Sequence, residues 1–273
     1  MSAVTAASFD LLRAGPCPQC GAPIEFTSAS ATAQICKHCN FIVARTDRDF
    51  TAVGRVADLI AIRSPFAVGA AGSIEGHRFI IGGRVQYDRA QAPGAPWDEL
   101  CLELASGGFS WLSHAQGKWI LTALYTEWMP LPAFADVEPG QSLAVPSGEV
   151  FKVVERGSRR AVSGEGELPF PINPEEVERF VDLSGPEGHF GTIDYGAGAD
   201  PPQIYFGREI DPLLVLLDGG GPPPTAPSVS TEALVCPGCG GNLPLAVPDL
   251  SERIVCRYCG QLSDVKEGAL QAL

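Results

Sequence analysis

Eight of the nine cysteines fall into four Cys-x-x-Cys pairs, and these pairs form two sets with matching spacing. Fifteen residues separate the two pairs of the first set, and sixteen separate those of the second. Each pair turns two thiolates towards one point, so two pairs supply the four corners of a tetrahedron, which suits Zn²⁺. The sequence therefore predicts two zinc ribbons, each with one structural Zn²⁺, whose ligands are Cys17, Cys20, Cys36 and Cys39 in the first and Cys236, Cys239, Cys256 and Cys259 in the second.

Other chemistries of clustered cysteines fit the sequence less well. A thioredoxin-like redox pair normally comes singly within a βαβ pattern, which this sequence does not show. Disulfides are disfavoured because the stretch from Met1 to Arg13 lacks the features of a secretion signal. Iron–sulfur ligation stays open, since four cysteines alone do not fix the metal.

The predicted zinc sites point to binding rather than to catalysis. A site closed by four cysteines has no open position for water, so it usually stabilises a fold. The chain carries a formal net charge of −13, and neither ribbon segment has a marked excess of Lys and Arg over Asp and Glu. We therefore expect the ribbons to contact a protein partner rather than nucleic acid.

The rest of the sequence offers few candidates for catalysis. It contains no phosphate-binding loop, no GxSxG nucleophile elbow and no HExxH helix, and its four histidines show no ligand spacing. The acidic candidates for acid–base work are Glu165, Glu167 and Asp194, but glutamates flanked by glycine are more often solvated loop residues. Cys101 has acidic neighbours that oppose a lowered thiol pKa, which favours a structural role. We expect no catalytic residue, and a binding protein more than an enzyme.

Between the ribbons, short apolar runs alternate with turn residues, which predicts a mostly β domain, either an open barrel or two packed sheets. Arg78–Tyr87 is typical of a strand with a bulge at Gly82-Gly83, and a meander of at least three strands follows it. Arg156-Gly-Ser158 is typical of a hairpin turn. Asn173-Pro-Glu-Glu176 begins like a short helix, although the residues after it also suit a strand.

These patterns divide the chain into four expected segments. They are an N-terminal zinc ribbon at 1–50, a β-rich domain at 51–218, a Gly/Pro-rich linker at 219–231, and a C-terminal zinc ribbon with its tail at 232–273. The longest wholly aliphatic run, Leu213 to Leu217, is far shorter than a membrane span. We therefore expect no membrane insertion and a cytoplasmic location.

The central segment resembles a known family. The matching motifs include Gly72-Ser-Ile-Glu-Gly76, Phe79–Tyr87, Trp97-Asp-Glu99, Gly117-Lys-Trp119 and Gly166-Glu-Leu-Pro169. Over roughly Thr51 to Leu217 the chain is similar to a bacterial family catalogued as domain of unknown function 4178, often found beside zinc ribbons. The resemblance implies a β-rich cytoplasmic module encoded near spermidine-synthase-like and membrane-associated stress proteins. It implies no reaction.

The residues and the resemblance together favour a zinc-binding, non-enzymatic cytoplasmic adaptor that acts through protein–protein contacts, in a membrane-stress or polyamine-linked setting. One alternative is an enzyme, or a binder of a cationic small molecule, with a pocket near the tryptophans of the β domain, which would suit the net charge. A second alternative is nucleic-acid binding through the ribbons. Because the tail after the second ribbon matches Phe41 to Val53, the chain could also derive from a tandem ancestor or be a shortened member of that architecture.

Overall fold

The structure is a computed structural model that describes residues 14–46, 49–59, 66–115, 118–145, 148–198, 201–219, 253–255, 262–266 and 269–272. Its regular elements are β-strands and three short 3₁₀ turns, η1 (Phe134–Asp136), η2 (Pro186–Gly188) and η3 (Pro212–Leu214). The prediction of a mostly β fold is therefore confirmed. Within the described ranges we find no helix with the length and apolar character needed to cross a membrane.

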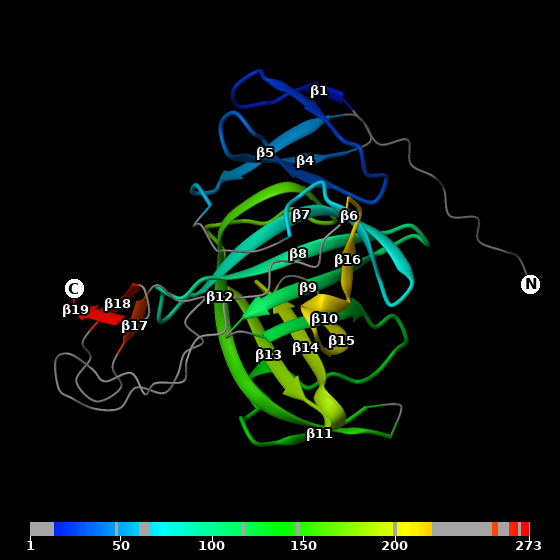
Figure 1. Cartoon of the computed structure of the whole chain (residues 1–273), viewed down its shortest axis with the longest axis vertical. Helices are drawn as coiled ribbons and strands as arrows, with labels where there is room; N and C mark the ends of the chain where they lie inside the picture. Colours follow the sequence, from blue (N-terminus) through cyan, green and yellow to red (C-terminus); the bar gives the residue numbers. More distant parts are fainter. Residues whose placement is uncertain are drawn as a thin grey trace, which may run out of the picture.

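Eight antiparallel strands close into a β-barrel (Figure 1). The ring closes because the last strand in the order pairs with the first. Around the barrel the strands are β7 (His77–Arg89), β8 (Trp97–Leu104), β9 (Phe109–Ala115), β10 (Lys118–Leu124), β15 (Gln203–Ile210), β14 (His189–Gly196), β13 (Glu178–Ser184) and β12 (Val150–Leu168). Of the two expected architectures, the barrel is the one formed, and β8–β9–β10 is the predicted meander.

The 19-residue strand β12 is the element that closes the barrel. Its first part pairs with β13, its second part with β7, and its last two residues with the N-terminal ribbon. The predicted hairpin at Arg156-Gly-Ser158 is wrong, because these residues run straight through β12. Gly157 lies opposite Phe180 of β13, and a Cβ at Gly157 would come within 2.7 Å of the Phe180 ring. The glycine thus makes room for an aromatic ring instead of a turn.

The predicted bulge at Gly82-Gly83 is confirmed by a register shift between Ile81 and Gly83. At this point β7 and β12 approach closely, because a Cβ on Gly83 would lie 2.2 Å from the carbonyl oxygen of Glu167. Gly166 also has a φ of +76°, a conformation that side chains with a Cβ rarely adopt. Both glycines are therefore required for barrel closure.

Shorter strands cover the outside of the barrel wall. β6 (Ala71–Ile74) joins β7, and β16 (Val215–Leu217) joins β6, while β11 (Ser142–Ala144) pairs with the start of β12. Leu100 and Leu102 of β8 are fully buried in one cluster with Ile74 and Val215. Cys101 between them packs in the other core cluster, so the two leucines share one face of β8.

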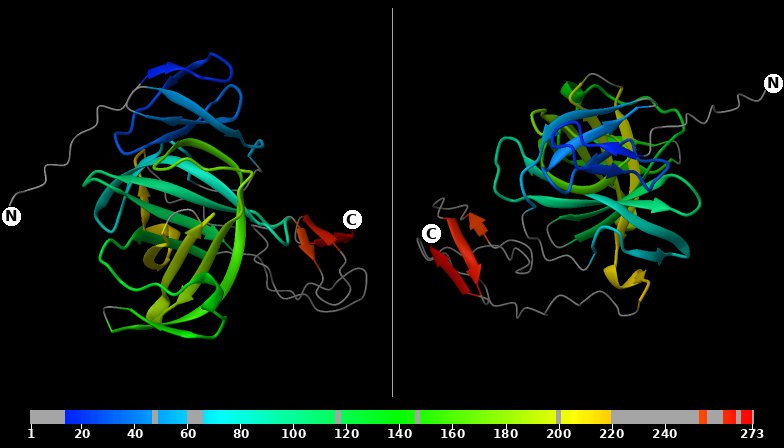
Figure 2. Two further views of the ribbon diagram at one scale, coloured as in Figure 1. Left: turned by 180° about the vertical axis from the view of Figure 1, so that it is seen from behind. Right: turned by 90° about the horizontal axis from the view of Figure 1, so that it is seen from above.

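The N-terminal ribbon lies at one end of the barrel (Figure 2). It consists of the hairpin β1 (Ala14–Pro16) and β2 (Pro23–Glu25) and the sheet β3 (Ala33–Ile35), β4 (Phe41–Arg45) and β5 (Phe50–Arg55). The expected segment boundary at residue 50 falls at the first residue of β5. Because β3 also pairs with the end of β12, the ribbon sheet continues the barrel sheet.

Two further segments bear on the predictions. Asn173–Glu176 forms a turn rather than a helix, although the Asn173 side chain accepts a hydrogen bond from the Glu175 backbone N–H as a helix cap would. Near the C-terminus β17 (Arg253–Val255), β18 (Leu262–Lys266) and β19 (Ala269–Ala272) form a separate three-stranded antiparallel sheet. Residues 220–231, most of the predicted linker, lie outside the described residues.

Candidate functional site: a four-cysteine metal centre on a charged barrel

The first predicted set of ligands comes together in the ribbon. The sulfur atoms of Cys17, Cys20, Cys36 and Cys39 all lie within 4.8 Å of one another. The Cys17–Cys39 and Cys20–Cys36 pairs are each 3.8 Å apart. Four thiolates at about 2.3 Å from one ion stand about 3.8 Å from each other in a tetrahedron. The sulfur positions therefore fit a tetrahedral metal ion.

Two matching knuckles hold these thiols. The backbone N–H of Gly21 donates to the Cys17 carbonyl, and the N–H of Asn40 donates to the Cys36 carbonyl, each at 2.9 Å. Gly21 and Asn40 also share a left-handed backbone, with φ of 75° and 58°. Glycine adopts this conformation freely, and asparagine is the side chain that best tolerates it after glycine. Sequence analysis did not single out Asn40.

The protonation of the thiols bears on how a metal would bind. Burial raises the pKa of Cys39 to about 12, although a backbone hydrogen bond from Phe41 acts against it. Burial also raises the pKa of Cys36. A metal ion bound here would displace these protons, since thiolates are the ligands.

Besides the β3–β12 pairing, one buried carboxylate connects the ribbon to the barrel. Glu167 of β12, only 7% exposed, accepts hydrogen bonds from the backbone N–H of Thr27 at 2.9 Å and of Ser28 at 2.8 Å. It also accepts one from the Thr27 hydroxyl at 2.7 Å. Both of its oxygens are thus used in holding the loop that follows β2.

Ribbon and barrel also share one hydrophobic core. Ala33, Ile35 and Ile42 of the ribbon pack in the same cluster as Val85 and Tyr87 of the barrel, all of them at most 3% exposed. A metal ion that orders the ribbon would therefore also support one end of the barrel.

The second predicted ligand set, Cys236, Cys239, Cys256 and Cys259, lies outside the described residues. The backbone around it nevertheless matches the first ribbon. β3 ends one residue before Cys36, and β17 ends one residue before Cys256. β4 and β18, which follow the last cysteine of each set, are both five residues long.

The glutamate pair considered for catalysis is not brought together as an acid–base site. Both residues lie in strand β12, not in a loop as expected. Glu167 holds the ribbon, and Glu165 forms an ion pair with Arg84 at 2.7 Å. The structure thus gives the two glutamates separate structural roles.

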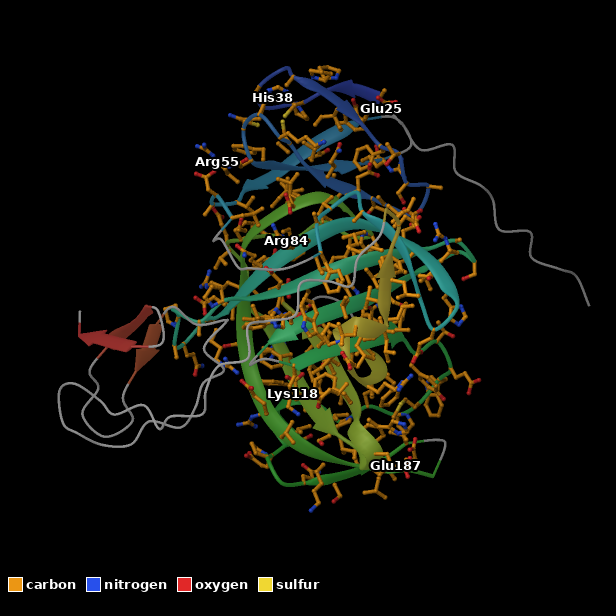
Figure 3. All side chains as sticks on the ribbon, in the orientation of Figure 1. Glu25, His38, Arg55, Arg84, Lys118 and Glu187 are labelled. Carbon is orange, nitrogen blue, oxygen red and sulfur yellow. The ribbon has the colours of Figure 1, made fainter. Side chains whose placement is uncertain are left out.

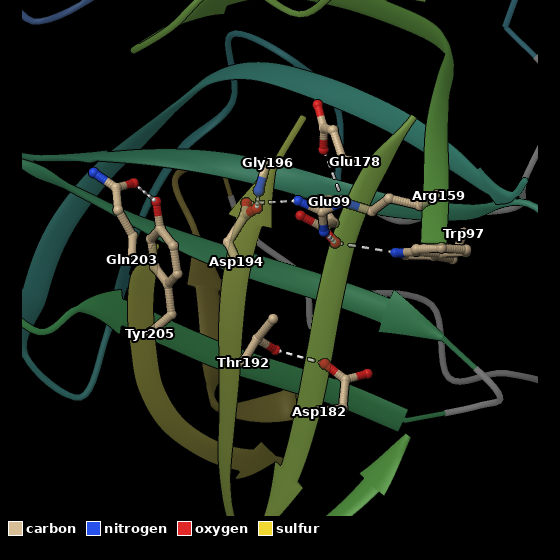
Figure 4. Close-up of polar contacts among 10 residues, drawn as sticks. All are labelled: Trp97, Glu99, Arg159, Glu178, Asp182, Thr192, Asp194, Gly196, Gln203 and Tyr205. Carbon is tan, nitrogen blue, oxygen red and sulfur yellow. Dashed lines mark hydrogen bonds and ion pairs between the residues drawn. The ribbon is translucent and has the colours of Figure 1, made fainter. Parts of the chain in front are cut away.

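Inside the barrel, a buried cluster of charges was missed by sequence analysis (Figure 4). The Arg159 guanidinium of β12 contacts Asp194 at 2.9 Å, Glu178 at 3.0 Å and Glu99 at 3.2 Å. These carboxylates come from β14, β13 and β8, so they meet only when the barrel closes. The guanidinium also lies 4.0 Å from the centre of the Tyr87 ring, in a cation–π arrangement.

Burial shifts the pKa values of carboxyl groups in the barrel interior. It raises the pKa of Glu178, which Arg159 counteracts, and it raises the pKa of Asp182 to about 7 despite a 2.8 Å hydrogen bond from the Thr192 hydroxyl. The cavity beside Arg159 has a volume of only about 40 Å³. That space suits one or two water molecules, so the cluster is a structural element of the barrel rather than a substrate site.

The other cysteine, three of the tryptophans and one histidine are either buried in the core or exposed at the surface. Cys101 is 4% exposed, and burial, followed by the charge of Glu103, raises its pKa to about 12. Trp111 and Trp119 are buried, whereas Trp128 is 86% exposed. His38 is exposed at the end of the ribbon away from the barrel (Figure 3).

A comparison with known protein families classifies the chain. Residues 67–212, more than half of the chain, match the family described as Domain of unknown function (DUF4178). The chain belongs to the DUF4178 family. The matched DUF4178 region begins before β6 and ends within η3, so it contains all eight barrel strands. The four-cysteine cluster and its ribbon lie outside it. No curated protein and no solved structure matches the chain.

Proposed function

We propose that the chain is a zinc-binding adaptor that acts through protein–protein contacts and catalyses no reaction. The metal would be Zn²⁺, because four clustered thiols at tetrahedral spacing are its common structural ligand set. A second Zn²⁺ would occupy the matching set at Cys236 to Cys259. A reducing compartment such as the cytoplasm keeps such thiols available for metal.

The observation that carries this proposal is Trp128. An indole ring that is 86% exposed leaves a large apolar surface in water, and tryptophan is among the residues that most often anchor protein interfaces. Met129 and Leu131, which follow it, pack against the barrel core. The loop therefore presents Trp128 from a fixed position, which lowers the entropy cost of binding.

The ribbons would supply additional contacts. Gln19, Lys37 and His38 at the knuckle tips of the first ribbon are exposed. The Gly/Pro-rich composition of 219–231 suits a tether for the second ribbon. Two linked weak contacts gain affinity through effective concentration, which suits a scaffold.

A native pull-down from the host in chelator-free buffer, read by mass spectrometry, tests this function. We expect a stoichiometric partner that is lost with Trp128→Ala. Leu216→Ala is the matched control, because it removes another apolar side chain that is 61% exposed. The identity of the partner would also test the membrane-stress or polyamine-linked setting.

Two outcomes would count against the adaptor. Recovery of the chain alone would contradict the proposal that it binds a protein partner. A partner that is kept equally by Trp128→Ala and by Cys236→Ser would show that neither the exposed tryptophan nor the second ribbon makes the contact.

A further inference from the structure

A cleft lies on the outer wall of the barrel and shares no residue with the four-cysteine cluster. Its volume is about 460 Å³, within the range of small-molecule sites. Its floor is formed by β10 and β15, where Leu121 pairs with Arg208 and Ala123 pairs with Phe206. Paired residues of an antiparallel sheet point to the same side, so these side chains share one face.

Aromatic rings gather at one corner of this cleft. The ring of Phe206 lies 5.5 Å from that of Tyr125, in a T-shaped arrangement, and 5.3 Å from that of Phe151. Gly191 of β14 makes room for Phe206, because a Cβ there would lie 3.0 Å from its ring. Faces of aromatic rings attract cations through their quadrupole.

Charged side chains line the rest of the cleft. Glu75 forms an ion pair with Arg208, and Glu149 lies 2.7 Å from Nδ1 of His189. Two glutamates face one arginine, so the cleft is formally negative when histidine is counted as neutral. The net charge of −13 on the whole chain adds to the attraction of a positive ligand.

Two non-glycine residues with a left-handed backbone lie at or near the cleft. Three residues other than glycine have a positive φ among those described, namely Asn40, Glu75 and Glu187. Asn40 belongs to the metal knuckle. Glu75 lines the cleft at the tip of the β6–β7 turn, and Glu187 lies two residues before His189. At Glu75 this conformation follows from the two-residue β6–β7 hairpin, because Gly76 beside it also has a positive φ, as this type of turn requires. The turn therefore fixes where the Glu75 backbone lies at the edge of the cleft.

From these observations we infer that the cleft binds a small organic ammonium ion, with its apolar groups against Phe206 and its charge balanced by Glu75 and Glu149. This site is independent of the adaptor role, since it shares no residue with Trp128 or the metal centre. The opposite possibility is an organic anion held by Arg208. The Glu75–Arg208 pair separates the two, because loss of Glu75 makes the cleft formally neutral, whereas loss of Arg208 makes it more negative.

The test is calorimetry on the metal-loaded full chain with three probes. Choline carries the cation, 3,3-dimethylbutan-1-ol is its neutral isostere, and benzoate represents an organic anion. We expect choline to bind about 3- to 30-fold more tightly than the neutral isostere, because the charge adds a cation–π interaction. Benzoate should show no binding.

Four substitutions sharpen the assignment. Glu75→Gln should weaken choline binding about 3-fold, and Arg208→Gln should strengthen it about 3-fold, as expected for half-exposed charges. Phe206→Leu should weaken it about 5-fold by removing the aromatic face. Glu138→Gln and Phe134→Leu, which alter the same residue types outside the cleft, should leave the affinity unchanged.

Several results would overturn the inference. Equal affinities for choline and its neutral isostere would show that the cleft recognises apolar groups and not the positive charge. Benzoate binding that increases with Glu75→Gln would make it an anion site centred on Arg208. No heat with any probe for a folded chain would mean that it takes none of these ligand classes.

Discussion

At the scale of the residue, the most consequential side chain is Arg159. It is one guanidinium among three carboxylates in the barrel interior, and each carboxylate lies within 3.2 Å of it. Removing one partner of a buried charge network leaves the others uncompensated, which costs about 3–5 kcal/mol. We therefore expect Arg159→Met to lower the free energy of unfolding by about that amount at pH 7, as measured by urea denaturation.

Arg159→Lys is the matched variant, since it keeps the charge but loses the fork of donors, and it should cost less than Arg159→Met. A loss below about 1 kcal/mol for Arg159→Met would contradict the role given to this residue, because that is the scale of exposed ion pairs.

Asp182 should make stability depend on pH. Burial raises its pKa in the folded state to about 7 from a usual 3.8, so the folded chain keeps a proton that the unfolded chain releases. The stabilisation is present below pH 4 and is lost as the pH rises from 4 to 7. Asp182→Asn should therefore flatten this part of the profile and stabilise the chain at pH 7 by about 2–4 kcal/mol.

Denaturation at several pH values would measure this effect. Glu138→Gln, at an exposed carboxylate with 70% side-chain exposure, should leave the profile unchanged. If the unfolding free energy of Asp182→Asn changes between pH 4 and 7 as it does for the parent chain, Asp182 is not the source of that pH dependence.

At the scale of the element, Glu167 supports the contact between the ribbon and the barrel, together with the β3–β12 pairing. Three hydrogen bonds from Thr27 and Ser28 end on its carboxylate. Hydrogen bonds to charged groups contribute about 1.5–3 kcal/mol, so Glu167→Ala should loosen the ribbon from the barrel. Hydrogen exchange should then speed up at residues 27–28 and in β3.

Glu165→Ala is the control, because its ion pair with Arg84 lies outside this contact. Unchanged exchange in β3 for Glu167→Ala would show that the β3–β12 pairing and the shared core hold the ribbon without this carboxylate.

How far the sequence predicts the elements depends on whether the signal is local. The alternating leucines of β8 and the glycine bulge in β7 are local patterns, and the structure contains both. The role of Gly157 in β12 has no local signal, because the glycine makes room for the Phe180 ring of a different strand. The same contrast applies to the candidate sites. The cysteine cluster can be predicted because its spacing is visible in the sequence. The Arg159 cluster cannot, because its carboxylates come from three other strands that meet only in the closed barrel.

At the scale of the whole molecule, the ribbon with its four clustered cysteines is continuous with the β-barrel. β3 extends the barrel sheet, and Ile35 and Ile42 share a core with the barrel. Structural metal ions contribute folding free energy directly, so loss of the metal should destabilise the ribbon and weaken the adjoining barrel end. The matching backbone of β17 and β18 leads us to expect a second ion at the C-terminal set.

Metal content by native mass spectrometry, with elemental analysis, tests this claim most directly. We predict two equivalents of zinc per chain, and one equivalent after either Cys36→Ser or Cys256→Ser. Cys101→Ser is the control and should keep both, because this buried cysteine lies outside the cluster. A chain that carries iron, or that keeps its full metal content after Cys36→Ser, would contradict the account.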